Sequence, residues 1–109
     1  SSPVKKEVVE QIELLNLSTL QKLHLKLLSH CLEIFREISK HSKVNFPTAK
    51  LLREWCDNQS KQFNDKKFND LLYEQLLSAS TKLSNFSRKI GKNINDLNIE
   101  DLIALVQEC

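Results

Sequence analysis

The stretch "STLQKLHLKLLSHCLEIFREISKH", residues 18–41, decides the fold, because it has the pattern of one long amphipathic helix. Ser18 and Gln21 match the S-x-x-Q capping box, in which each side chain bonds the other residue's backbone N–H at a helix start. Apolar residues then recur at helical spacings of three, four or seven in two adjoining stripes. The first is Leu20, Leu27, Cys31, Ile34 and Ile38, and the second is Leu25, Leu28, Leu32 and Phe35. A face this wide predicts a central helix with neighbours on two sides.

Breaks on both sides of this stretch separate it from further helices. "HSKVNFPT", 41–48, ends the central helix, because the residue before a proline is pushed out of helical backbone angles. Before the central helix, Ser2 is expected to cap a first helix with Pro3 at its first position. After the central helix, a third helix is expected over about 47–61. The side chains it is expected to bury are Leu51, Leu52, Trp55 and Cys56.

A fourth helix is predicted to begin at a cap on Asn64 or Asp65 and to end at Gly91. Its apolar residues again recur three and four apart: Phe68, Leu72, Leu76, Ala79, Leu83, Phe86 and Ile90. "SASTKLSNFS", 78–87, contains five hydroxyl residues. Hydroxyl side chains weaken helix propensity, so a kink or a break is expected near 78–81.

A last helix follows a second capping-box pattern, formed by Asn98 and Asp101. Its expected buried residues are Leu102, Leu105 and Val106. The sequence therefore predicts an all-α fold, a compact bundle or helical array of about five helices, whose short connections favour antiparallel neighbours. Residues 1–109 are expected to form one domain, and we expect this domain to be a fragment of a larger protein.

The composition limits the functional classes. Hydrophobic residues make up 40% and charged residues 28% of the chain, which is typical of a globular domain. No apolar run approaches the ~20 residues of a membrane span, and the N-terminal residues lack the apolar core of a secretion signal. Three cysteines at irregular spacing form no disulfide framework, which favours a reduced nuclear or cytoplasmic location. The net charge of +2 is too small to indicate nucleic-acid binding by itself.

Histidines and cysteines in the central region raise the possibility of a metal or nucleophile site. His30 and Cys31 are adjacent on a helix, so they point about 100° apart and cannot share an ion. A nucleophile at Cys56 that uses His24, His30 or His41 as its base would have no third group to orient it and no glycine-rich turn for an oxyanion hole. We therefore expect no metal, no cofactor and no catalytic residue, with Cys31 and Cys56 in the core.

Two clusters of cations lie at the ends of the predicted fourth helix. Lys61, Lys66 and Lys67 form the first, which Phe63 and Phe68 flank. Arg88, Lys89 and Lys92 form the second. A solvated helix end is the simpler interpretation, and two docking points for a partner are the functional one. The single tryptophan, Trp55, follows Leu51 and Leu52 on one helix face, which favours a core role over an interface role.

Two stretches resemble known families. "LEIFREISKHSKVNFPTAKLLRE", 32–54, resembles the N-terminal helical domain of transcription elongation factor S-II and its relatives, although "CDNQSKQF", 56–63, stands in place of that family's glycine-valine turn. The spacing of "LLSHCLEIF", "LLREW", "KKFNDLL" and "LSNF" is similar to that of the C-terminal helical domain of the large Ku subunit. The resemblances imply a non-catalytic adaptor of a nuclear protein in transcription or DNA repair.

The sequence thus predicts a protein–protein docking module and not an enzyme. The expected partner is an acidic or aromatic-containing disordered segment. Its expected contacts are Lys61, Phe63, Lys66, Lys67, Arg88, Lys89 and Lys92. Nucleic-acid binding through the same cations, or homo-oligomerisation through the apolar face of residues 18–41, are the alternatives.

Overall fold

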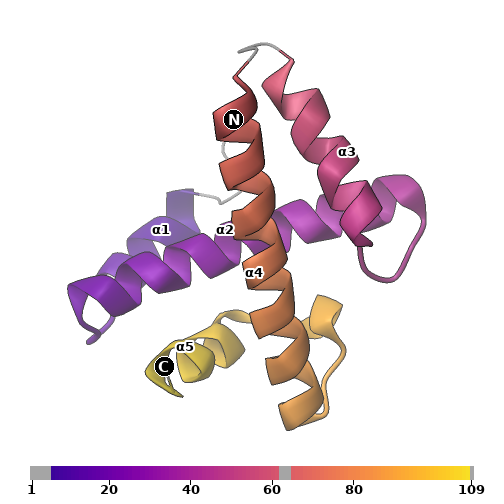
Figure 1. Cartoon of the computed structure of the whole chain (residues 1–109). Helices are drawn as coiled ribbons and strands as arrows, with labels where there is room; N and C mark the ends of the chain where they lie inside the picture. The colour runs from indigo at the N-terminus through magenta and orange to yellow at the C-terminus, as the bar shows by residue number, and fades with distance from the viewer. Residues whose placement is uncertain (1–5, 62–64, 109) are drawn as a thin grey trace.

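Five α-helices and one 3₁₀ turn make up residues 6–61 and 65–108, the part of the chain that this computed structural model describes (Figure 1). Their bounds are α1 Lys6–Glu13, α2 Thr19–Ser42, α3 Ala49–Ser60, α4 Lys66–Ile90, η1 Ile94–Asp96 and α5 Ile99–Glu108. These residues contain no strand, and the predicted all-α class is confirmed. The predicted caps on Ser2 and Asn64 and the contact residue Phe63 lie outside the described residues.

The central helix α2 forms where the sequence predicts it. Gln21 N donates to Ser18 Oγ over 3.1 Å, and Ser18 N donates to Gln21 Oε1 over 2.9 Å, so the capping box is complete. At the other end Lys43 adopts a left-handed conformation with φ 55°, which lets Val44 N donate back to Ser39 O over 3.1 Å. The helix spans the predicted range to within one residue.

Side-chain caps also define the next two helices. Thr48 Oγ1 accepts from Leu51 N over 3.2 Å, so α3 begins just after Pro47. Asp65 Oδ1 accepts from Phe68 N over 3.1 Å at the start of α4. The expected kink or break near 78–81 is wrong, because α4 runs straight and without interruption (Figure 1). Thr81 Oγ1 there donates to Leu77 O over 3.2 Å, so this hydroxyl bonds its own helix without breaking it.

The fifth helix carries the second predicted capping box. Asp101 N donates to Asn98 Oδ1 over 2.9 Å, and Asn98 N donates to Asp101 Oδ2 over 3.0 Å. Leu97 and Leu102, which flank this box, are both buried. The η1 turn before it was not predicted from the sequence, and Asn93 caps it through Asn95 N over 2.9 Å.

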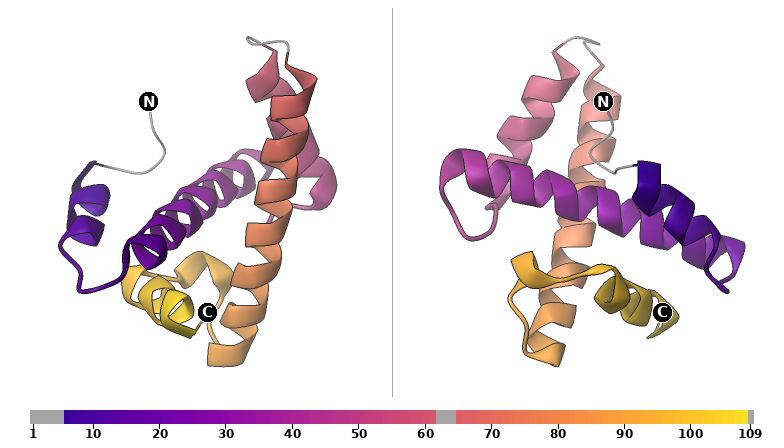
Figure 2. Two further views of the ribbon diagram at one scale, coloured as in Figure 1. Left: turned by 60° about the vertical axis from the view of Figure 1, so that its left-hand side comes forward. Right: turned by 180° about the vertical axis from the view of Figure 1, so that it is seen from behind.

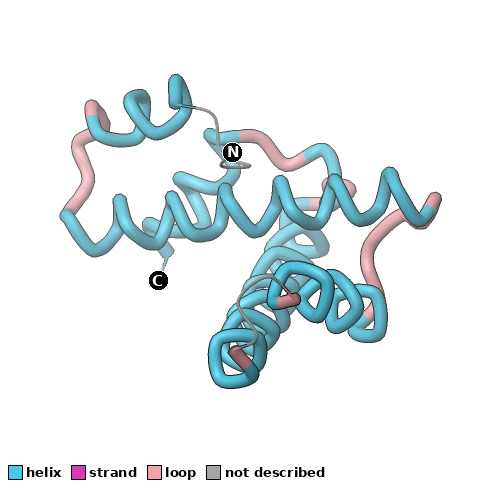
Figure 3. Tube along the Cα trace, turned by 90° about the horizontal axis from the view of Figure 1, so that it is seen from above, coloured by secondary structure: helices cyan, strands magenta, loops and turns pink. Residues whose placement is uncertain are grey.

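Helix α2 is the axis around which the other helices are arranged. Figures 1 and 2 show α4 crossing the middle of α2, with α3 alongside the first half of α4 and in contact with the end of α2. Helix α1 folds back along the first half of α2, and α5 lies against that same half from another side (Figures 2 and 3). The pairs α1–α2 and α3–α4 are therefore neighbours through short connections, as predicted, whereas α2 and α4 cross.

The core lies where these helices meet. Every member of the second predicted stripe of α2 is buried: Leu25, Leu28, Leu32 and Phe35. The first stripe is buried only from Cys31 onward, and the prediction for Leu20 and Leu27 is wrong, since both are exposed. Phe68 and Ile90 at the ends of α4 are also exposed. No helix of the described residues is long and apolar enough to cross a membrane.

Candidate functional site

Leucines on the first half of α2 form an apolar strip that the neighbouring helices leave uncovered. Leu20, Leu23 and Leu27 have exposed fractions of 77%, 53% and 42%. Residues three and four apart share one helix face, so the three side chains are contiguous. The strip is open because α4 covers this face of α2 only further along, where Cys31 and Ile34 are buried.

The strip leads into an apolar cleft of about 320 Å³ between α1, α2 and α4. Val9, Leu27, Leu72 and Leu76 are among the side chains that line it. On α4, two exposed apolar residues precede lining residues of the cleft by one helical turn, Phe68 (48% exposed) before Leu72 and Leu71 (71% exposed) before Gln75. We call this cleft, together with Leu20, Leu23, Leu27, Phe68 and Leu71, the leucine surface. Exposed apolar side chains on the helices around an apolar cleft are typical of interaction sites.

One cation at the edge of the leucine surface is already neutralised within the chain. Lys26, which lines the cleft, pairs with Glu13 at the end of α1. The hydrogen bond from Lys26, together with the charge of that lysine, holds the pKa of Glu13 below its ordinary value. The pair fastens α1 to α2 beside the cleft and leaves the cleft itself apolar.

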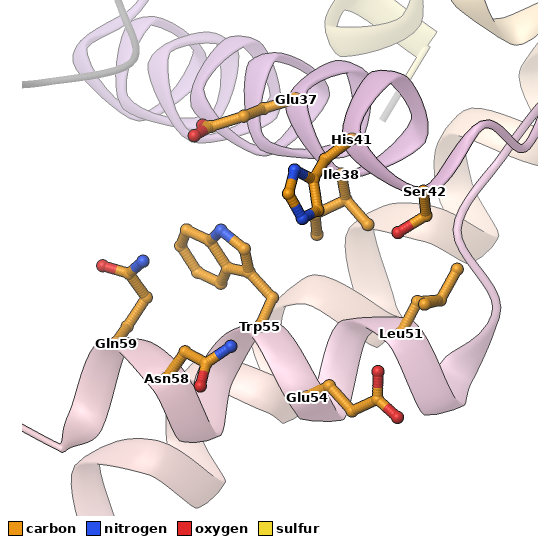
Figure 4. A pocket seen from close by; sticks show the side chains of 9 residues that line it. All are labelled: Glu37, Ile38, His41, Ser42, Leu51, Glu54, Trp55, Asn58 and Gln59. Atoms are coloured by element: carbon orange, nitrogen blue, oxygen red, sulfur yellow. The ribbon is translucent and has the colours of Figure 1, made fainter.

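A second cleft, of about 530 Å³, lies between the last turns of α2 and helix α3 (Figure 4). The side chain of Trp55 rises from α3 into this space, and His41 of α2 lies on the opposite side. Glu37 and Glu54, both exposed, are carboxylates of the same lining, one from each helix. We call this the tryptophan cleft. Trp55 packs partly against the core, as predicted, but it also faces the cleft.

The two central cysteines are core residues in the structure. Cys31 and Cys56 are buried, as predicted, and burial raises the pKa of each thiol to about 11. Within residues 6–61 and 65–108, no three His, Cys, Asp or Glu side chains come together in a way that could hold a metal ion. His30 lines the apolar cleft and His41 the tryptophan cleft, so these two histidines face different surfaces.

The two predicted cation clusters lie at opposite ends of α4. Lys61, Lys66 and Lys67 are exposed at the α3–α4 end. At the other end Lys89 pairs with Glu108 over 2.9 Å and Lys92 pairs with Asp101 over 2.5 Å. A 25-residue helix extends about 37 Å, so the clusters do not form one patch.

The second cluster already has partners inside the chain. Arg88 is exposed and donates to Asn85 Oδ1 over 2.5 Å. The two ion pairs of Lys89 and Lys92 hold α5 to the end of α4. Binding of a partner at either cluster stays a prediction.

Sequence reasoning missed two residues of the leucine surface. Leu23 and Leu71 fall outside the predicted stripes, although Leu23 lies three residues after Leu20 and four before Leu27. That spacing was a usable signal that Leu23 shares a helix face with these two members of the first stripe. Its exposure was not predictable from spacing, since a periodic pattern shows which residues share a face but not whether that face is covered.

Fold and surface together define a small all-α domain with an uncovered apolar surface on its central helix. The chain belongs to the family described as NDH complex assembly factor CRR9, whose family model matches residues 4–109. No curated protein and no solved structure matches the chain. Membership in a family of assembly factors agrees with the expectation of a protein partner.

The family overturns both resemblances drawn from the sequence. The chain is not a relative of the elongation factor S-II domain or of the large Ku subunit domain, because the family model covers residues 4–109. The predicted role in nuclear transcription or DNA repair and the predicted nuclear location are therefore also wrong. Both resemblances depended on the spacing of apolar helix residues, which many small helical domains share.

Proposed function

We propose that this chain is a non-catalytic docking module that binds a protein component of the NDH complex while that complex is assembled. The family description supports the assembly role. The proposal includes a thylakoid-associated location, in place of the nuclear location expected from the sequence. The leucine surface supports docking, and it is the observation that carries the proposal.

The leucine surface suits the apolar side of a partner helix or strand. Leu20, Leu23 and Leu27 supply a straight row along one helix, and the cleft at its end accepts a side chain. Fully burying one leucine contributes about 1.5–3 kcal/mol of transfer free energy. Because about 1.4 kcal/mol corresponds to a tenfold change in affinity, losing two leucines that a partner fully buries should weaken binding by roughly a hundredfold or more.

The lysines at the α3–α4 end supply a second proposed contact. Lys61, Lys66 and Lys67 are exposed and form no ion pair within the described residues. They are near Phe68 of the leucine surface along the chain. A partner segment with acidic as well as apolar side chains would match both features. Charge reversal at Lys66 and Lys67 is then expected to slow association in low salt without affecting the fold.

The test replaces exposed leucines in the source organism. A strain that lacks this chain is complemented with the wild type, with Leu20→Ser/Leu23→Ser, or with the control Val44→Ser. Val44 is also exposed, but it lies beyond the other end of α2. The amount of assembled NDH complex is measured on native gels. We expect the double variant to fail and the control to succeed.

Two results would count against the proposal. If the strain without the chain keeps its full amount of NDH complex, the assembly role is wrong. If the double variant restores the complex as well as the wild type does, docking does not depend on the leucine surface. Circular dichroism of the purified variants shows whether the fold is intact, which is expected because the replaced side chains are exposed.

A further inference from the structure

The tryptophan cleft has the dimensions and the aromatic wall of a binding site. Its volume of about 530 Å³ falls within the range of small-ligand clefts, about 300–1,000 Å³. The Trp55 ring is half-buried and faces the space between α2 and α3 (Figure 4). A tryptophan held by the core on one side and open on the other is a typical anchor of interfaces.

The lining of the cleft around Trp55 is acidic. Among the side chains that line the cleft, Glu37 and Glu54 are carboxylates and none is Lys or Arg. Neither glutamate takes part in an ion pair in the described part of the chain, although Lys40 and Lys50 lie within one helical turn of them. The cleft therefore matches a ligand with positive charge.

Arg53, the arginine of α3, does not neutralise the cleft because it contacts side chains of α4. Its Nη2 atom donates to Asp70 over 2.7 Å, and its guanidinium lies 4.9 Å from the centroid of the Tyr73 ring. This contact shows the same combination of carboxylate and aromatic ring holding a guanidinium inside the chain. In the tryptophan cleft the Trp55 ring and the Glu37 carboxylate lie on the same side, and the lining includes no lysine or arginine.

We propose that the tryptophan cleft binds an arginine side chain from a segment of a partner protein, with the guanidinium over Trp55 and its N–H groups toward Glu37, while Glu54 adds negative charge at the other end of the cleft (Figure 4). Arginine fits better than lysine because its planar guanidinium stacks on an indole and can donate two parallel hydrogen bonds to one carboxylate. The amide groups of Asn58 and Gln59, which also line the cleft, can bond the backbone of the bound segment. This site is separate from the leucine surface.

The experiment uses Trp55 as its own reporter, since it is the only tryptophan of the chain. Tryptophan fluorescence is followed during titration with three short peptides of one sequence, which contain arginine, lysine or the neutral isostere citrulline. We expect a saturable change with the arginine peptide, with a roughly millimolar Kd for so small a ligand. The lysine peptide should bind at least several-fold more weakly and the citrulline peptide not measurably.

Two double variants separate a site from general charge attraction. Glu37→Gln/Glu54→Gln should abolish the response to the arginine peptide. The control Glu74→Gln/Glu100→Gln removes the same amount of charge from exposed residues outside the cleft, and it should respond like the wild type. Both variants replace exposed side chains, and circular dichroism verifies their fold.

Several results would overturn the proposal. These are no saturable response in the wild type, an equal response to the citrulline peptide, or an unchanged response in Glu37→Gln/Glu54→Gln. An equal loss in the control variant would show attraction by net charge and would also overturn it. None of these results bears on the leucine surface, whose test measures assembly of the NDH complex.

Discussion

Cys31 and Cys56 illustrate at the residue scale how burial removes reactivity. A metal ligand or a nucleophile was the alternative role of each thiol, since both chemistries use the thiolate form, and the sequence favoured the core instead. In the structure both side chains are enclosed by apolar neighbours, and burial raises both pKa values to about 11. At neutral pH the thiols are thus protonated and act as small apolar side chains.

This burial predicts a difference in thiol reactivity. In a Cys109→Ser background, Cys31 and Cys56 should not react measurably with a thiol reagent at pH 8 while the chain is folded. With a pKa of about 11, roughly one thiol in a thousand is a thiolate at that pH. In denaturant two thiols per chain should react at once, as counted by absorbance. Rapid reaction of either cysteine in the folded chain would contradict its buried position.

The lowered pKa of His24 predicts how the free energy of unfolding depends on pH. Burial, and then the charge of Lys82, lowers the pKa of His24 below its ordinary value of 6.5. The unfolded chain therefore binds a proton here more readily than the folded chain does. The contribution of His24 to the free energy of unfolding is full above about pH 6.5 and falls as the pH is lowered through and below that value.

Urea unfolding between pH 5 and pH 8 checks this expectation. His24→Gln should show less loss of stability toward pH 5 than the wild type. His41→Gln, which changes an exposed histidine on the same helix, should keep the wild-type dependence. A loss of the same size in His24→Gln and in the wild type would assign the pH dependence to other groups.

At the scale of the element, the helix ends follow from short sequence patterns. The capping boxes at Ser18 and Asn98 and the single caps at Thr48 and Asp65 all form with their residues three positions later. These bonds are local, so neighbouring helices do not have to be placed first. Tertiary packing, and not a local pattern, explains why α4 is continuous. Packing of Leu76, Ala79 and Leu83 into the core outweighs the weak helix propensity of the hydroxyl residues.

At the scale of the element, we predict how substitution of Gly91 changes stability. It ends α4 in a left-handed conformation with φ 71°, and Lys92 N donates to Ser87 O over 3.0 Å beyond it. A Cβ atom at this position meets no atom within 4 Å, so only the backbone conformation disfavours a side chain. Gly91→Ala should lower the free energy of unfolding by about 1–2 kcal/mol.

Gly91→Asn supplies the matched control. Asparagine tolerates left-handed angles better than alanine does, so this variant should lose less stability although its side chain is larger. Thermal or urea unfolding measures both. A greater loss in Gly91→Asn than in Gly91→Ala would show that space, and not the backbone angle, limits this position.

At the scale of the whole molecule, Arg36 joins segments that are far apart in the sequence. Its Nη2 atom donates to Asn95 O over 3.1 Å and to Leu97 O over 2.6 Å, which fixes the η1 turn against α2. Glu33 pairs with its Nη1 atom over 2.8 Å and orients the guanidinium. Asn95 Nδ2 in turn donates to Asn45 O over 2.5 Å, so the α2–α3 connection is held to the same turn.

Arg36→Leu tests this connection. The change leaves two backbone carbonyl groups without their charged donor, and hydrogen bonds to charged groups contribute about 1.5–3 kcal/mol. We expect a loss of stability of about that size in urea unfolding. Arg88→Leu removes an exposed arginine whose contact is within its own helix, and it should change stability by less than about 0.5 kcal/mol. Equal effects of the two substitutions would deny Arg36 this role.

The sequence determined the all-α class, the range of α2 and its caps, and the burial of Leu25, Leu28, Leu32 and Phe35. Periodicity and capping connect residues at most four positions apart, so these patterns can be recognised in the sequence without knowledge of the fold. Only the tertiary structure decided that Leu20 and Leu27 remain exposed, that Trp55 faces a cleft with Glu37 and Glu54, and that Arg36 reaches Leu97. Each of these depends on which helix covers which face, and that is set by contacts between residues many positions apart in the chain.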